Sequence, residues 1–414
     1  MTRIRVNVQA EPPRFTRPGR GDRRRDDRTP TRTRAARTLH RALLPLALAL
    51  CCLTQAGCLN AYLADRLIAP PNGGGKEGIE TLTAPGFLNG GGSLPVGPPE
   101  RPATIVHWVV EPGPFAVEVV PDGQARSPLD DAVEAIDAPR GQRWVVIRCS
   151  HPRLPRDLVL RRPVGDAGPQ QLGEREAVAT VFLLQGWGSR QRTLPYLWHV
   201  AGWLADAGCR VVMPDLRGQG DSSGDALTFG YLERRDLAAL ADDLEARGLI
   251  DGPLGVIGHS YGGGTAIQWA AVDPRVRRVL ALSPYADGQS AGETVRALLA
   301  DTAPVRAFFL NPILSDARFA AVGERVQREL GYDLAGASPL ASMPRVAAPV
   351  LLVHGTQDRN VPFSNARRLR AARPAGTRLI PVEGAGHFRF LLERDAELKV
   401  WVLGWLQGLL TGQP

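Results

Sequence analysis

The chain has 414 residues, of which 44% are hydrophobic and 22% are charged, so it is long enough and apolar enough to bury a sizeable core. Its formal net charge is +8, but residues 1–41 contain thirteen arginines and four acidic residues, a net +9, which leaves −1 for the remainder. A nucleic-acid-binding protein carries its basic residues over a folded face. This distribution therefore argues against nucleic acid as a partner.

An uncharged, leucine-rich segment at 42–53 follows the basic run and ends near the small pair Ala56-Gly57. It is shorter than the roughly 20 residues that a helix needs to span a bilayer, and it is typical of the apolar part of a secretory signal. The pair before Cys58 resembles a bacterial lipoprotein processing site, although Gln55 stands where such sites usually carry leucine. We therefore predict that Cys58 is the lipidated first residue of a mature protein.

This prediction makes residues 1–57 a basic n-region plus signal peptide and places the protein in the cell envelope, anchored on the periplasmic or surface side of a bacterial membrane. A soluble exported protein and an uncleaved anchor or cytoplasmic protein are the alternatives. Glycine and proline make up nearly half of residues 70–100. Because such a composition is a poor former of helix or strand, residues 58–102 are predicted to be a flexible tether before a domain over 103–414.

The predicted elements of that domain begin with short β-rich runs near 104–110, 115–120 and 144–149, which favour antiparallel strands. From residue 178 the sequence pattern changes. Continuous apolar runs, as expected for strands of a parallel sheet that is buried on both faces, alternate with segments that have helical periodicity. The predicted strands are 178–184, 209–213, 254–257, 279–282, 350–353 and 378–382. The predicted helices are near 194–207, 230–247, 261–272, 362–373 and 390–410.

Repeated strand–helix units predict an α/β fold with a mostly parallel sheet and helices on both of its faces. Residues 288–340 interrupt this alternation, because they look helical and contain no buried-strand run. We interpret this segment as an insertion that forms a cap over the carboxyl ends of the strands.

Two serines match the pattern G-x-S-x-G, namely Ser260 in GHSYGG and Ser222 in GDSSG. In a hydrolase this pattern marks a sharp turn between a strand and a helix that exposes the serine above a sheet. Ser260 has an apolar strand before it and a helix after it, whereas Ser222 lies in a polar stretch with no helix until about residue 230. Ser260 is therefore the predicted nucleophile.

A serine nucleophile needs a base, and the base needs an acidic residue that orients it. In a sheet of this kind the chain order is serine, then acid, then histidine. Asp358 follows a predicted strand, and His387 is the histidine that lies beyond it, in a glycine-flanked loop after the last strand. We predict Asp358 as the orienting acid and His387 as the base. A turn aspartate that caps the next helix is the alternative for Asp358, and Glu383 is a weaker candidate for the acid.

Backbone N–H groups are expected to stabilise the oxyanion of the reaction intermediate. One comes from the residue after the nucleophile, Tyr261, and the other from the loop after the first parallel strand, for which Trp187 is the candidate. The histidines are scattered without the spacing of metal ligands, so no metal and no cofactor are expected.

Five blocks, QGWGS, PDLRGQGDSSG, GHSYGG, APVLLVHGTQDRNVP and GAGHF, stand over about 175–412 in an order and spacing that resemble the α/β-hydrolase superfamily. The resemblance implies an α/β-hydrolase fold with a triad of Ser260, Asp358 and His387 under a variable cap, and hydrolysis through an acyl-enzyme. The last blocks are similar to the serine aminopeptidase, lysophospholipase and prolyl oligopeptidase-like branches. Relatives often carry histidine where Gln185 stands here.

The partner that this resemblance implies is a small-molecule or short-peptide acyl substrate. Cleavage of a carboxylic ester is the leading prediction. A serine aminopeptidase or amidase with the same triad is an alternative, which acidic side chains of the insertion such as Glu293, Glu324 or Glu329 would favour if they faced the pocket. An acyltransferase and a catalytically silent binding protein are further alternatives.

Overall fold

The structure is a computed structural model in which the described residues all belong to the compact unit Gly57–Pro414. They are 90–121, 133–137, 143–149, 156–164, 172–188, 197–288, 316–332 and 338–413. The predicted signal peptide and Cys58 lie outside them. None of the helices in these ranges is both long enough and apolar enough to cross a membrane.

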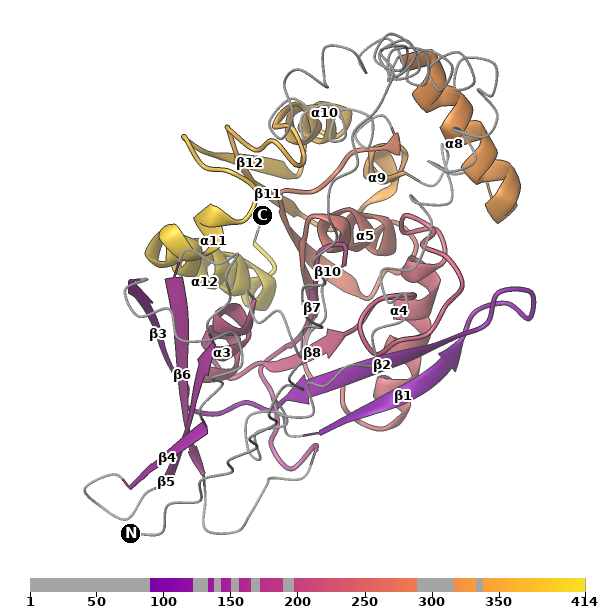
Figure 1. The fold of residues 1–414 in the computed structure, drawn as a ribbon. Coiled ribbons are helices and arrows are strands. Elements are labelled where there is room, and N and C mark those ends of the chain that lie inside the picture. Colours follow the sequence, from indigo (N-terminus) through magenta and orange to yellow (C-terminus); the bar gives the residue numbers. More distant parts are fainter. Residues whose placement is uncertain are drawn as a thin grey trace, which may run out of the picture. The chain divides into compact units, whose positions relative to one another are not determined.

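Eight strands form one mixed sheet in the order β1-β2-β8-β7-β9-β10-β11-β12 (Figure 1). β2 is antiparallel to both of its neighbours, and the strands from β8 to β12 in this order are parallel. This arrangement confirms the predicted α/β fold. The bounds are β1 Gly90–Val96, β2 Ala103–Val110, β7 Thr180–Leu184, β8 Arg210–Pro214, β9 Leu254–His259, β10 Val276–Leu282, β11 Val350–Gly355 and β12 Thr377–Val382.

Helices cover both faces of this sheet, as predicted. Their bounds are α3 Trp198–Asp206, α4 Glu233–Ala246, α5 Tyr261–Ala270, α8 Asp316–Leu330, α9 Pro339–Ser342, α10 Ser364–Ala372, α11 Arg389–Glu393 and α12 Asp395–Thr411, with a 3-10 turn η2 at Met343–Arg345. One apolar cluster joins α3, α11 and α12 to one face of the sheet, and a second joins α4, α5 and α10 to the other.

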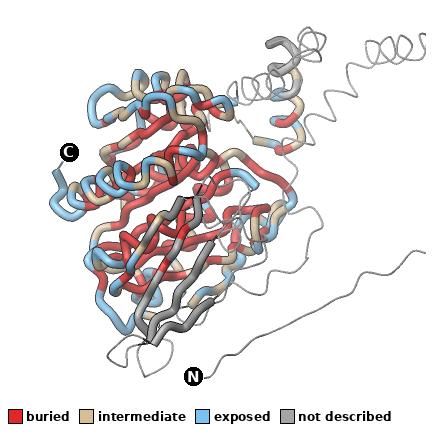
Figure 2. The backbone as a smooth tube through the Cα atoms, turned by 60° about the vertical axis from the view of Figure 1, so that its left-hand side comes forward, coloured by how far each residue is buried: buried red, intermediate tan, exposed pale blue. Residues whose placement is uncertain are grey.

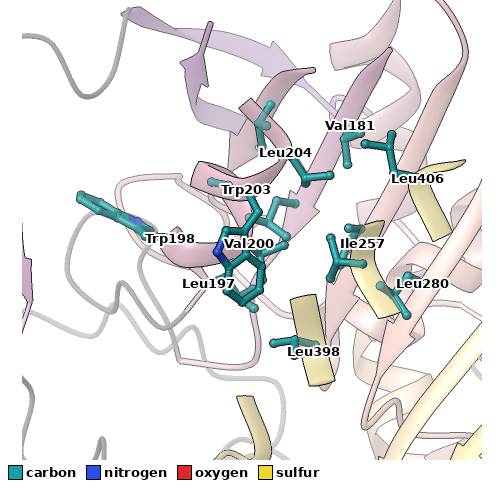
Figure 3. Close-up of a cluster of buried hydrophobic side chains, with 14 of the residues drawn as sticks. Val181, Leu197, Trp198, Val200, Trp203, Leu204, Ile257, Leu280, Leu398 and Leu406 are labelled. Carbon is teal, nitrogen blue, oxygen red and sulfur yellow. The ribbon is translucent and has the colours of Figure 1, made fainter. Parts of the chain in front are cut away.

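Successive residues of the central strands alternate between these two clusters. In β7, Val181 belongs to the cluster under α3 and α12, and Phe182 belongs to the cluster under α4 and α5. Every residue of β7, β8 and β9 is buried, and Figure 2 shows this buried centre between more exposed helices. Figure 3 shows part of the first cluster, in which Val181 and Ile257 of the sheet lie near Leu204 of α3. The sheet is therefore a rigid support for the loops at its edges.

A second, four-stranded antiparallel sheet is inserted between β2 and β7, in the order β3-β6-β5-β4. Its strands are β3 Ala116–Pro121, β4 Val133–Asp137, β5 Arg143–Cys149 and β6 Arg156–Val164. Leu158 and Leu160 of β6 belong to the apolar cluster of α3. Gly202 of α3 leaves room for Val117 of β3, since a Cβ on this glycine would lie 2.7 Å from the valine side chain. The antiparallel opening predicted from the sequence is confirmed.

The predicted tether over 58–102 is wrong for its last part, because Gly90–Val96 forms the edge strand β1. The three glycines at its start pair with residues of β2, and a Cβ on Gly92 would lie 3.0 Å from the ring of His107. Glycine therefore allows close approach to β2 here, and Val96 adds a buried side chain at the other end of the strand. Residues 58–89 lie outside the described ranges.

The predicted helix over 390–410 is divided at Arg394, whose φ of −117° and ψ of 35° are not helical. Asp395 and Glu397 then lie in the first turn of α12, where negative charge favours a helix start. Within the predicted insertion at 288–340, the described parts are α8, α9 and the residues directly around them.

Candidate active site

Ser260 lies between β9 and α5, in a turn with φ of 54° and ψ of −114°. Positive φ is costly for a residue with a Cβ, and such outliers persist where the surrounding structure enforces them. The Ser260 N–H donates to the carbonyl of Leu282 at 2.8 Å, and the Ser260 carbonyl accepts from the N–H of Gly264 at 3.1 Å. The strand, turn and helix predicted around Ser260 are confirmed.

Glycine is required on both sides of this turn because the backbone passes itself closely. A Cβ on Gly258 would overlap the carbonyl of Gly262. A Cβ on Gly262 would lie 2.6 Å from the carbonyl oxygen of Leu184 at the end of β7. These contacts bring the turn against the neighbouring strand, so the two glycines of the motif fix where Ser260 stands.

Asp358 and His387 are brought together from the ends of β11 and β12. The Nδ1 of His387 donates to Oδ2 of Asp358 at 2.7 Å, and the Asp358 side chain is fully buried. Oδ1 accepts from the N–H groups of Asn360 and Val361 at 2.9 and 2.8 Å. The hydrogen bond leaves Nε2 as the nitrogen of His387 that can take a proton.

A second histidine, His354, contacts the same carboxylate oxygen. Its Nε2 lies 3.2 Å from Oδ2 of Asp358 and 2.8 Å from the carbonyl oxygen of Val361. Both of these groups are acceptors, so Nε2 carries the proton, and the buried Nδ1 has no hydrogen-bond partner within the described part of the chain. Burial opposes ionisation of Asp358, but the hydrogen bonds from His354 and His387 outweigh it and hold the pKa of Asp358 well below its usual value.

A third histidine, His259, supports the loop that carries His387. Its Nε2 donates to the carbonyl of His387 at 3.2 Å, and its ring centroid lies 4.7 Å from that of His387. Burial is the main cause that lowers the pKa of His259 well below its usual value. His259 therefore acts as a neutral hydrogen-bond donor inside the fold.

The loops after β7 and β8 are joined at the same edge of the sheet. Gln219 accepts from the N–H of Gly188 at 2.9 Å, and Gln185 donates to the Asp215 carboxylate at 2.9 Å. Trp187 lies between these anchors, with 56% of its surface exposed. Gln185 thus makes a buried hydrogen bond at the position where relatives often have histidine.

Ser222, the other serine of a G-x-S-x-G pattern, is only 2% exposed. Its hydroxyl donates to the carbonyl of Asp215 at 2.6 Å and accepts from the N–H of Val106 at 2.8 Å. These bonds connect the loop after β8 to β2. The hydroxyl of Ser222 therefore has a structural role in this loop.

A buried carboxylate that the sequence reasoning missed lies behind Tyr261. Glu233 is fully buried and accepts hydrogen bonds from the Tyr261 hydroxyl at 2.8 Å, from the N–H of Gly230 at 2.9 Å, and from both the N–H and the hydroxyl of Thr228. The network surrounds Phe229, which has a φ of 52° and donates its N–H to the Tyr261 hydroxyl. The first side chain of α5 is therefore fixed by the start of α4.

In the part of the chain that the structure describes, no group of three histidine, cysteine, aspartate or glutamate side chains is arranged to hold a metal ion. Glu383 is exposed and accepts from the Thr356 hydroxyl at 3.2 Å, away from the bond between Asp358 and His387. Of the acidic residues predicted to matter for a peptidase, Glu329 pairs with Arg325 at 2.6 Å, and Glu324 is exposed, 3.9 Å from Arg328. Glu293 lies outside the described residues.

A serine in a strained turn, at the edge of the sheet where β11 and β12 bring an aspartate and a histidine together, is the architecture of a hydrolase. The chain belongs to the Alpha/beta hydrolase family, whose model matches residues 181–399. Among curated proteins it is similar to the pimeloyl-[acyl-carrier protein] methyl ester esterase of Neisseria meningitidis serogroup B (strain H44/76). The two are 28% identical over 256 residues, which cover 53% of this chain and 90% of the relative.

Among solved structures the chain is similar to an esterase of Pyrococcus furiosus, with a TM-score of 0.44 and 20% identity, covering 70% of this chain and 98% of that one. It is also similar to a bacterial membrane phospholipase A, with a TM-score of 0.41 and 17% identity, covering 90% of this chain and 99% of that one.

Proposed function

We propose that the protein hydrolyses carboxylic esters through an acyl-enzyme formed on Ser260. In this reaction His387 takes the proton of the Ser260 hydroxyl and later gives it to the leaving alcohol. Asp358 fixes the His387 tautomer that has its proton on Nδ1 and stabilises the imidazolium that forms. The observation that carries this assignment is the 2.7 Å hydrogen bond between His387 and Asp358, at the edge of the sheet where Ser260 follows β9.

The backbone N–H groups of Tyr261 and Trp187 are proposed as the donors that stabilise the oxyanion. Tyr261 begins α5, and Trp187 follows β7, the strand that pairs with β9. The loss of one such donor in other enzymes costs about 2.7–4 kcal/mol of transition-state stabilisation. Gln219 would act indirectly, by holding the loop of Trp187 through Gly188.

Small acyl esters are the proposed substrates, since curated relatives are named as methyl ester esterases. The peptidase alternative gains no support from Glu324 and Glu329, because these described side chains are exposed or paired with arginine on α8. A panel of methyl, p-nitrophenyl and aminoacyl esters of different acyl length, with aminoacyl anilides beside them, separates the two activities.

The experiment that tests the nucleophile is labelling with a fluorophosphonate, followed by peptide mapping. We expect modification of Ser260 and none of Ser222, whose hydroxyl is buried and hydrogen-bonded. Ser260→Ala should abolish turnover of p-nitrophenyl esters while leaving the circular dichroism spectrum unchanged. A labelled Ser222, or full activity of Ser260→Ala, would refute the assignment.

We also propose that the protein is exported and anchored in the cell envelope through a lipid on Cys58. The apolar segment at 42–53 and the small residues before Cys58 support this proposal. Cys58→Ser should move the protein from the membrane fraction to the soluble fraction of the envelope. Unchanged fractionation of Cys58→Ser, together with wild-type protein that still carries residues 1–57 by mass spectrometry, would contradict it.

A further inference from the structure

A cavity of about 930 Å³ lies between α12 and the strands β10, β11 and β12. Its walls include Val350 and Leu351 at the start of β11 and Thr377 and Arg378 at the start of β12. These are the amino ends of parallel strands, whereas Ser260, Asp358 and His387 all follow carboxyl ends. The cavity is thus at the opposite edge of the sheet from the proposed triad. Its volume is within the range of about 300–1,000 Å³ that is usual for small-molecule sites.

Two glycines on α12 hollow out one wall of this cavity. Gly404 and Gly408 are one helical turn apart, and both line it. A Cβ on Gly404 would meet nothing within 4 Å, whereas a Cβ on Gly408 would overlap the guanidinium of Arg278. Glycine is a poor helix former compared with alanine, so α12 gives up helical stability at two positions that keep this space open.

The charges around the cavity are of one sign. Arg278 and Arg378 line it, and no aspartate or glutamate of the described ranges does. Arg278 donates from Nη1 to the carbonyl of Gln413 and has no carboxylate partner among the described residues. Arg210 and Arg217, the arginines of the described residues that are at most 1% exposed, are paired with Glu111 and Asp236, whereas no ion pair accompanies the buried Arg234 among these residues. Partial burial lowers the pKa of Arg278, which a bound anion would offset.

Apolar side chains form much of the rest of the lining. Leu351, Ile380 and Trp401 are partly buried there, and Val400 is 69% exposed. Trp405 and Thr377 are more than nine-tenths buried, and the indole N–H of Trp405 and the hydroxyl of Thr377, which have no hydrogen-bond partner among the described residues, are enclosed by protein.

We propose that this cavity binds a long-chain monocarboxylate, a free fatty acid, with its carboxylate on Arg278 and its hydrocarbon chain against Leu351, Ile380 and Trp401. A guanidinium binds a carboxylate through two parallel hydrogen bonds, which suits a single head group beside an apolar wall. Charge complementarity thus selects an anion, and the apolar lining selects one with a hydrocarbon tail. This site does not depend on the proposed esterase activity.

Isothermal titration of the full-length protein with sodium dodecanoate, below its micellar concentration, tests the proposal. We expect saturable binding of one dodecanoate, and weaker binding of acetate and of dodecan-1-ol. Arg278→Gln should weaken dodecanoate binding at least tenfold. Gly404→Leu should do the same, because the leucine side chain would extend into the cavity without meeting other protein atoms near the Cβ. Gly323→Leu on α8 is the matched control, since its Cβ also meets nothing within 4 Å, and it should bind as the wild type does.

Protein labelled beforehand with fluorophosphonate distinguishes this cavity from the proposed active site. Binding that survives labelling and falls in Arg278→Gln supports the proposal even if Ser260 proves not to be the nucleophile. Binding that is lost on labelling, or that is equal in wild type, Arg278→Gln and Gly404→Leu, overturns it. Sedimentation velocity that shows a dimer dissociated by Gly404→Leu, with no dodecanoate binding, would instead identify this face as an interface between copies and also overturn it.

Discussion

The carboxylate of Asp358 accepts four hydrogen bonds, two at each oxygen. Backbone N–H groups from the following turn fix one oxygen, and two histidine side chains share the other. Such a carboxylate cannot rotate without breaking several hydrogen bonds, so it holds the His387 ring in a fixed orientation. The electrostatic contribution of Asp358 should therefore be visible both in catalysis and in stability.

Asp358→Asn should lower kcat for a p-nitrophenyl ester by about 10⁴, because the amide does not stabilise the required histidine tautomer. Glu383→Gln is the control, and a comparable loss there would reassign the acid. Since the pKa of Asp358 is depressed in the folded state, its stabilising contribution is present above the unfolded pKa of about 3.9 and is lost as the pH falls through the folded pKa. The difference in unfolding free energy between wild type and Asp358→Asn, from urea titrations, should therefore shrink between pH 7 and pH 3.

His354 should act as a positioning residue for Asp358. Hydrogen bonds to charged groups contribute about 1.5–3 kcal/mol, so His354→Leu is expected to lower kcat by about tenfold to a hundredfold with little change in KM. His354→Gln keeps an N–H donor and should retain most of the activity. Steady-state kinetics of both variants decide the matter, because equal losses in the two would indicate a packing role only.

At the scale of secondary structure elements, the sequence motif already indicates that the turn from β9 to α5 needs glycine. The structure adds which groups each of these glycines contacts. Gly262 lies against the end of β7, so the nucleophile turn and the strand before the Trp187 loop are in direct contact. A change at this glycine would therefore disturb both sides of the proposed oxyanion site.

Gly262→Ala should lower kcat by about a hundredfold, since a shift of about 1 Å at a reacting group has that effect, and it should destabilise the fold by about 1–3 kcal/mol through overpacking. Gly323→Ala in α8 is the control, because the added Cβ meets nothing within 4 Å and alanine favours a helix. Thermal unfolding and turnover of the two variants test this expectation. Wild-type kcat in Gly262→Ala would show that the turn tolerates a side chain.

Sequence reasoning found the elements with strong periodicity and missed features set by long-range contacts. The strands from β7 to β12 and the helices between them were predictable because apolar runs and helical spacing alternate. β1 was not, since its glycine-rich start is stabilised by its pairing with β2 rather than by its own side chains. Glu233 had no local signal, and the contact of His354 with Asp358 was not predictable from the order of the histidines along the chain.

At the scale of the whole molecule, one buried ionic network connects the antiparallel opening to the parallel sheet. Arg210 at the start of β8 donates to Glu111, after β2, at 3.0 Å, and to Asp251, before β9, at 2.6 Å. Glu111 also accepts from the N–H of Gly173, ahead of β7. Segments that are distant in sequence are therefore joined at the amino edge of the sheet.

Arg210→Met should destabilise the protein by about 3–5 kcal/mol, because it leaves the buried Glu111 without its partner. The double variant Glu111→Leu, Arg210→Met should recover much of this loss, since an apolar pair of similar volume often replaces a buried ion pair at little cost. Urea unfolding of both variants provides the measurement. A double variant that is less stable than Arg210→Met would contradict this expectation. It would show that Glu111 stabilises the fold through contacts other than its ion pair with Arg210.

Ser260, Asp358 and His387 follow three different strands, of which β12 is the edge strand and the last to be synthesised. A nascent or partly refolded chain that has not yet added β12 to the sheet therefore lacks the histidine of the proposed triad, even if its nucleophile turn is already formed. Regain of turnover during refolding should report completion of the sheet, and a chain that crosses a membrane unfolded would be inert until it arrived.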